Sequence, residues 1–160
     1  MSEEVLNFIN GQWVATKGKG EKLVRKDPGN GDEICHMRQA DNADVDAAVA
    51  AAKATFAEWK KVPRPERAKL ILNSVEIVRR RKEEIAQLMT REMGKPIAEA
   101  RGDVQEAIDM AYYIAAEGRR GWGYSIPSEL PNKRMYTMRQ PLGVCALITP
   151  WNFPIAVPSW

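Results

Sequence analysis

The residues best suited to chemistry lie near the end of the chain, in the run Thr149-Pro150-Trp151-Asn152-Phe153-Pro154. This run follows a continuous apolar stretch at residues 144–148, and ligands of open α/β sheets bind just beyond the carboxyl ends of such strands. The side-chain amide of Asn152 can donate a hydrogen bond to an oxyanion, and a preorganised donor of this kind contributes about 2.7 to 4 kcal/mol. From residue type alone, an Asn between two aromatic residues is more often a turn residue that satisfies nearby backbone groups. Residue type alone leaves both roles open.

Nucleophilic and metal chemistry have little support in the sequence. Cys35 and Cys145 lie far apart in apolar surroundings, without metal-ligand spacing, so we expect both to be buried thiols. His36 is the only histidine and flanks a strand without any motif of a Ser-His-Asp site, so we expect a surface or hydrogen-bonded histidine. No metal site is predicted.

Charge gives no sign of a nucleic-acid partner. The 24 basic and 21 acidic residues leave a net charge of +3, which is too even to define a polyanion-binding surface. The basic run at residues 79–82 is followed at once by Glu83 and Glu84, a pattern typical of a solvated helix face. Gly94-Lys95-Pro96 lacks the glycine loop that precedes the lysine of a phosphate-binding P-loop.

The first forty residues predict short strands. Asn10-Gly11 between apolar and aromatic residues is a strong signal for a tight hairpin within residues 8–14. The turn-rich segment 27–31 separates two further strands, at residues 23–26 and 33–37.

The middle of the chain predicts three helices. Asp41 can cap the first, which carries Asp44 in its first turn and runs to about Lys60. Pro65 suits the first position of the second helix, which Gly94 would end, and a third helix follows Pro96 and ends at the glycines from Gly118. The apolar stripes of the three are Val45, Val49, Ala52, Phe56 and Trp59; Ala68, Ile71, Leu72, Val75, Val78, Ile85, Leu88, Met89 and Met93; and Ile97, Ala100, Val104, Ile108, Ala111 and Ala115.

Two strands are predicted after the helices. Residues 133–140 alternate in character like a half-exposed strand, and residues 144–148 suit a strand covered on both faces, as in a parallel sheet. A helix competes at 144–148, but the β-branched ends favour a strand. With no apolar run near the ~20 residues of a membrane span, and no export signal after the acidic start, we expect a cytoplasmic globular protein.

Several motifs in order make the chain resemble the aldehyde dehydrogenase superfamily. The most specific part leads from Gln140-Pro141-Leu142-Gly143-Val144 through residues 148–154 to Pro158-Ser159-Trp160. The opening at residues 8–14, the pair Tyr112-Tyr113 and the stretch Arg91-Glu92-Met93-Gly94-Lys95-Pro96 with Glu99-Ala100-Arg101 agree with it. The resemblance covers essentially the whole chain, and it explains residues 94–96 as a corner between two helices.

This resemblance implies a site. Asn152 is expected to be the side-chain half of an oxyanion hole. Four residues before it, Ile148, Thr149, Pro150 and Trp151, are expected to line the path of NAD or NADP. Four others, Phe153, Ala156, Val157 and Trp160, match positions that shape the aldehyde tunnel, although an ordinary core helix would have the same apolar character.

The same resemblance implies an α/β fold that is incomplete. Residues 1–131 and 142–160 would be part of an NAD(P)-binding domain with an incomplete dinucleotide-binding sheet, and 132–141 a strand of the oligomerisation region. The family's cysteine nucleophile, general-base glutamate and ribose-binding residues have no counterpart in residues 1–160. We therefore expect an aldehyde-oxidising parent that forms homo-oligomers, and an isolated chain that is inactive and binds cofactor weakly or not at all. The alternative is a non-catalytic module that associates with itself or a partner.

Overall fold

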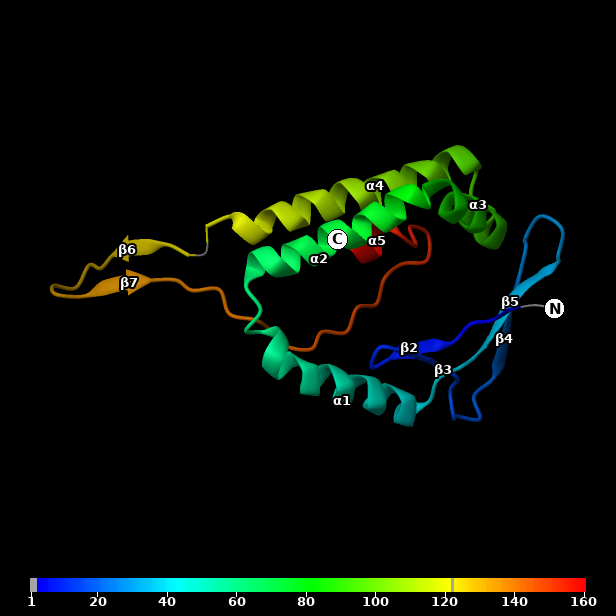
Figure 1. Ribbon diagram of the computed structural model, residues 1–160, viewed down its shortest axis with the longest axis horizontal. Coiled ribbons are helices and arrows are strands. Elements are labelled where there is room, and N and C mark those ends of the chain that lie inside the picture. The colour runs from blue at the N-terminus through cyan, green and yellow to red at the C-terminus, as the bar shows by residue number, and fades with distance from the viewer. Residues whose placement is uncertain (1–2, 122) are drawn as a thin grey trace.

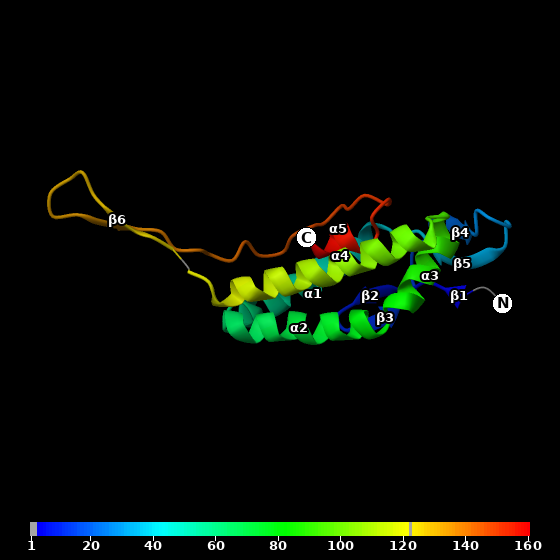
Figure 2. The ribbon, with the colours of Figure 1, turned by 90° about the horizontal axis from the view of Figure 1, so that it is seen from above.

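The structure is a computed structural model, and it describes residues 3–121 and 123–160. Two long helices, α2 and α4, lie side by side, with α3 at one end and the β6–β7 hairpin projecting beyond the other (Figures 1 and 2). The helices are α1 (Asn42–Trp59), α2 (Arg64–Arg80), α3 (Lys82–Met93), α4 (Ile97–Ala116), the 3₁₀ turn η1 (Glu117–Arg119) and α5 (Ala156–Ser159). The strands are β1 (Glu3–Glu4), β2 (Asn7–Ile9), β3 (Gln12–Val14), β4 (Lys22–Lys26), β5 (Glu33–Arg38), β6 (Ser125–Pro127) and β7 (Arg134–Tyr136).

The amino-terminal strands form as the sequence predicts. Strands β2 and β3 pair antiparallel across Asn10 and Gly11, which have φ angles of 51° and 76° as a two-residue hairpin turn requires. The rings of Phe8 and Trp13 lie opposite each other, with centroids 4.9 Å apart. A separate three-stranded sheet has the order β1-β5-β4, in which β4 and β5 are antiparallel and β1 is parallel to β5.

Helix α1 begins at the predicted cap. The Asp41 carboxylate accepts from the Asp44 N–H, and the Asp44 carboxylate accepts from the Asp41 N–H, which satisfies two amides at the helix start. The Thr16 hydroxyl also donates to Asp44, and this bond is the main cause that lowers the pKa of that carboxyl. No residue of α1 is buried, so its apolar stripe is largely uncovered in this chain.

The prediction of three helices is wrong in one respect: the predicted second helix is divided into α2 and α3, so the described part of the chain has four long helices. The break is at Arg81, whose ψ of 12° departs from helical geometry and lets α3 turn away from α2 and pack on α4. The sequence gives no warning of this break, because Arg81 is neither Gly nor Pro and the apolar stripe continues across it. Pro65 also occupies the second position of α2, since the helix begins at Arg64.

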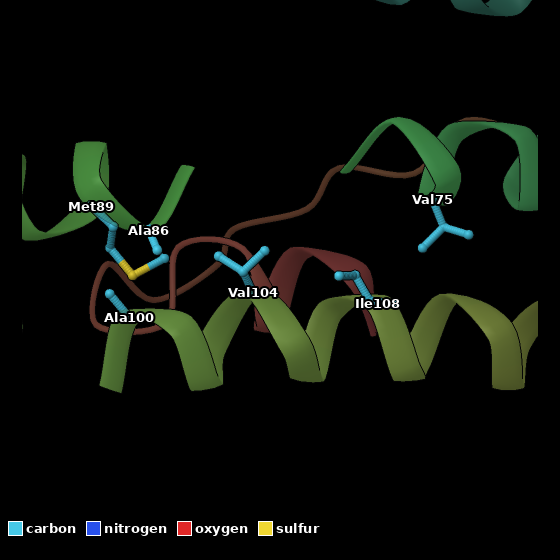
Figure 3. Close-up of a cluster of buried hydrophobic side chains, with 6 residues drawn as sticks. All are labelled: Val75, Ala86, Met89, Ala100, Val104 and Ile108. Carbon is cyan, nitrogen blue, oxygen red and sulfur yellow. The ribbon is translucent and has the colours of Figure 1, made fainter. Parts of the chain in front are cut away.

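The core lies between α2, α3 and α4. Six buried side chains meet there, one from α2, two from α3 and three from α4 (Figure 3). They are Val75, Ala86, Met89, Ala100, Val104 and Ile108. All six were on the predicted apolar stripes except Ala86, so helical periodicity located most of the core.

The segment after α4 differs most from the prediction. Only residues 134–136 of the expected strand at 133–140 form a strand, and they pair with β6. Residues 144–148 form no strand, and Leu147 and Ile148 are 73% and 99% exposed. A strand needs a neighbour for its backbone hydrogen bonds, and none of the described residues pairs with this stretch. Cys145 is therefore exposed, not buried as expected, while Cys35 in β5 is half-buried.

Candidate functional site

A corner between α3 and α4 supports the end of the chain. Gly94 ends α3 in the left-handed conformation, with φ of 74° and its N–H bonded to the Thr90 carbonyl at 2.9 Å. Pro96 caps α4, which begins at Ile97. The corner predicted for residues 94–96 is therefore present, and Lys95 within it reaches the turn formed by residues 151–155.

Lys95 makes three contacts through one ammonium group. Its Nζ lies 2.9 Å from Asp103 Oδ2 and 2.9 Å from the backbone carbonyl oxygen of Asn152. It also lies 4.0 Å from the centroid of the Phe153 ring, a distance suited to a cation–π interaction. The Lys95 side chain is only 9% exposed, so water screens these contacts little.

Asp103 holds the other end of the same turn. Its Oδ1 accepts a hydrogen bond of 2.9 Å from the N–H of Ala156, the first residue of α5. Within residues 3–121 and 123–160, Asp103 is the one buried charged residue. Removing one partner of a buried ion pair typically costs about 3–5 kcal/mol, because the other charge is left uncompensated. One carboxylate thus holds both Lys95 and the start of α5.

The structure brings part of the predicted site together. Asn152 and Phe153 lie against Lys95, and Ala156 is fully buried where α5 meets α4. Val157 is half-buried and Trp160 is 59% exposed. The expected cofactor residues, Ile148, Thr149, Pro150 and Trp151, are all exposed and lead into the turn without regular secondary structure.

The weaker candidates gather no catalytic arrangement. His36 Nδ1 lies 3.6 Å from Glu33 Oε1, on β5. Arg79 pairs with Glu76, and Arg81 pairs with Glu84, so the basic run is the solvated face that was predicted. Among the described residues no group of three metal-ligating side chains comes together, and no helix is long and apolar enough to cross a membrane.

An apolar groove runs beside the site. Its volume is about 520 Å³, and it lies between α2, α4 and α5, with Leu70, Ile71 and Ile155 among its walls. A second cavity of about 580 Å³ lies at the far end of α2, where Lys60, Arg64 and Arg139 face it. Asn152 lines neither, so cavities alone would not identify the site.

Sequence reasoning missed the roles of Lys95 and Asp103. The available signal was Asp103 itself, which falls on the face of α4 that carries Ala100 and Ala107. A carboxylate at a core position is rarely buried unless it has a partner. Nothing in the sequence, however, showed that the partners were Lys95 and the backbone near residues 152 and 156.

Comparison with known proteins agrees with this architecture. The model of the aldehyde dehydrogenase family matches residues 13–160. The alpha-ketoglutarate semialdehyde dehydrogenase of Haloferax volcanii is 39% identical over an alignment of 161 positions, which covers 100% of this chain and 33% of that protein. The alpha-ketoglutaric semialdehyde dehydrogenase of Bacillus subtilis is 41% identical over 97% of this chain and 32% of its own length.

The fold agrees as well. A crystal structure of an NADP-dependent enzyme from Escherichia coli superposes with a TM-score of 0.91 at 34% identity, over 98% of this chain and 32% of that one. The chain thus spans about a third of the length of the proteins it matches. Since the family model covers nearly all of it, and the overall fold superposes on the solved structure, the chain belongs to the aldehyde dehydrogenase family.

Proposed function

We propose that these 160 residues form the amino-terminal third of an NAD(P)-dependent aldehyde dehydrogenase that oxidises an aldehyde to a carboxylate. The observation that carries the proposal is the turn at residues 151–155, which Lys95 and Asp103 hold at both ends while the Asn152 residue stays exposed. A donor on a fixed backbone is preorganised, which is what stabilising a developing negative charge requires.

In this role the Asn152 amide donates to the aldehyde oxygen as negative charge grows on it. Phe153, Val157 and Trp160 contribute apolar surface for the rest of the aldehyde, and Ala156 supports them from its buried position against α4. The thiol nucleophile and the general base belong to parts of the enzyme outside this chain. Neither Cys35 nor Cys145 is assigned that role.

The residues expected to meet the cofactor fit a flat, partly apolar group. Ile148 and Trp151 are 99% and 79% exposed and lie directly before Asn152, so a ring bound along this stretch would lie next to the oxyanion donor. A bound nicotinamide would supply the hydride acceptor. The two relatives described above are named for semialdehydes, so semialdehydes are the first substrates to test.

A fusion tests the proposal. Residues 1–160 would replace the matching third of the Bacillus subtilis relative, and reduced cofactor would be measured by absorbance with semialdehydes and short aldehydes. We expect turnover by the fusion and none by the isolated chain or by the remaining two thirds alone. A folded fusion that binds cofactor but turns over no aldehyde would contradict the proposal, as would turnover by the pure 160-residue chain.

The oxyanion role of Asn152 has its own measurement in that fusion. Asn152→Ala should lower kcat by about 10²- to 10³-fold, the range seen when one oxyanion donor is removed. The affinity for the cofactor should change far less, because the amide acts on the transition state. Unchanged single-turnover chemistry in a folded variant would instead leave Asn152 as a turn residue.

A second candidate function is a self-associating module. The β6–β7 hairpin projects from the helices, each of its strands is paired along one edge only, and Met135 and Tyr136 are 48% and 73% exposed (Figure 1). Unpaired strand edges are templates for pairing with another copy. In the intact enzyme the same surface would serve homo-oligomer assembly. The enzyme and the self-associating module would therefore both use the hairpin, and only a measurement of catalysis separates them.

A further inference from the structure

We infer that Lys95 is a positioning residue for the oxyanion donor: its ammonium fixes the backbone of Asn152, and Asp103 fixes Lys95 and the far end of the same turn. The inference rests on the proposed function, because it assigns a task to residues that the proposed chemistry does not touch directly.

Lys95 acts on Asn152 through the backbone carbonyl group of that residue. Lys95 Nζ donates to that oxygen at 2.9 Å, which restrains the peptide plane between residues 152 and 153. The side-chain amide extends from the same residue, so the backbone that Lys95 holds sets the position and direction of its Cα–Cβ bond. The Phe153 ring rests on the same ammonium, 4.0 Å from its centroid. One charge therefore orients the proposed donor and a neighbouring apolar wall.

Asp103 makes this arrangement rigid. Its two oxygens bind Lys95 Nζ and the Ala156 N–H, each at 2.9 Å, and its side chain is fully buried. Residues 152 and 156 are thus tied to a single carboxylate on α4, which is part of the packed core. Without the ammonium, the turn keeps its attachment at residue 156 but loses the one at residue 152.

Catalysis is sensitive to small displacements of this kind. A misplacement of about 1 Å by a change away from the chemistry can cost about 10²-fold in rate. We expect Lys95→Met to lower kcat of the active fusion by about 10- to 10²-fold, with a smaller change in the KM for the cofactor. Lys95→Arg, which keeps a charged donor, should restore part of the rate.

The matched control is Lys82. It is half-buried, and its Nζ donates to Gln105 Oε1 at 2.7 Å, so it too joins α3 to α4, at the opposite end of α3 from Lys95. No hydrogen bond or ion pair joins it to residues 151–156, and Lys82→Met should leave kcat within about twofold of the parent. Lys95→Met combined with Asn152→Ala should be little slower than Asn152→Ala alone, because an amide that is absent cannot be misplaced.

A charge-balanced variant separates positioning from folding. Lys95→Met alone leaves Asp103 as an uncompensated buried charge, which by itself destabilises the fold. Lys95→Met with Asp103→Asn removes both charges and keeps an oxygen to accept from the Ala156 N–H. We expect this double variant to recover thermal stability but not kcat. Recovery of both would overturn the inference, because Lys95 would then serve only to neutralise Asp103.

Hydrogen exchange in the isolated 160-residue chain gives a test that needs no activity. Lys95→Met should speed exchange of the Val157 amide, which donates to the Phe153 carbonyl across the turn, by at least about tenfold, and Lys82→Met should not. Equal exchange in both variants would overturn the inference even if the fusion is active. An inactive fusion with the expected exchange difference would instead contradict the proposed function and leave the positioning contact established.

Discussion

At the scale of single residues, the corner at Gly94 depends on one backbone conformation. Its φ of 74° lies in the left-handed region, and a Cβ added there would lie 3.1 Å from Pro28 Cγ. The chain reverses direction at Gly94 and passes close to the turn at residues 27–31. This path accounts for both the positive φ and the short distance to Pro28. Lys95 is the next residue of this corner, so a displaced backbone at Gly94 would also displace the side chain that bonds to the Asn152 carbonyl.

We predict that Gly94→Ala destabilises the chain by about 1–2 kcal/mol, the usual cost of the left-handed conformation for an L-residue. Gly102→Ala is the matched control, because Gly102 is inside α4 with nothing near its added Cβ, and there alanine should stabilise by roughly 0.5–1 kcal/mol. Urea unfolding followed by circular dichroism measures both changes. Equal effects of the two substitutions would show that backbone conformation at the corner does not matter.

At the scale of elements, local signals in the sequence were reliable and long-range ones were not. The hairpin at Asn10-Gly11, the cap at Asp41 and the stop at Gly94 each depend on neighbours within a few residues, and all were confirmed. The strand expected at residues 144–148 depends on partner strands, and the break at Arg81 depends on how α3 packs on α4. Periodicity and residue propensity predict neither which strands will pair nor how one helix packs on another.

The packing of α3 on α4 has an electrostatic part that pH can test. Both guanidinium nitrogens of Arg101 that face Glu83 bond to its carboxylate, at 2.8 and 2.9 Å, and these bonds hold the pKa of Glu83 at about 2 instead of the usual 4.5. A lowered folded-state pKa means that the pair stabilises the fold above about pH 4.5 and that this contribution is lost as the pH falls towards 2.

We therefore expect Glu83→Gln to lower the melting temperature slightly at pH 6, and the difference from the parent to shrink as the pH falls from 4.5 to 2. The effect is small because both side chains are about half exposed, and added salt should reduce it further. Glu84→Gln is the comparison, since Arg81 lowers the pKa of Glu84 in the same direction but lies three residues away at the α2–α3 break. This variant therefore loses a local ion pair without touching the contact between α3 and α4. A difference that is constant from pH 6 to pH 2.5 would contradict the assignment.

At the scale of the whole molecule, much apolar surface is uncovered. The groove between α2, α4 and α5 includes Leu70, which is 51% exposed, and the projecting hairpin adds two free strand edges. Patches of this kind mark surfaces that bind other proteins, and about 800 Å² per partner is enough for a specific interface.

We predict that the isolated chain self-associates as its concentration rises, which light scattering after size-exclusion chromatography would detect. Leu70→Glu should weaken association if the groove takes part, whereas Leu88→Glu, at an equally exposed position outside the groove, should not. If neither changes the association, the hairpin edges carry it. A monomer at every concentration would contradict the prediction.

Lys95 and Asp103 are far along the chain from the turn that they hold, and this separation sets an order of events during synthesis. Asp103 and Lys95 bind groups 53 and 57 residues later in the sequence. Ribosomes add about 5–20 residues per second and domains fold from the amino terminus, so α4 is finished several seconds before residue 156 is joined. During that interval the Asp103 carboxylate has no Ala156 N–H to bind, and of its two partners in the folded chain only Lys95 has been made. The turn at residues 151–155 is made after α4, and it completes the burial of this charge.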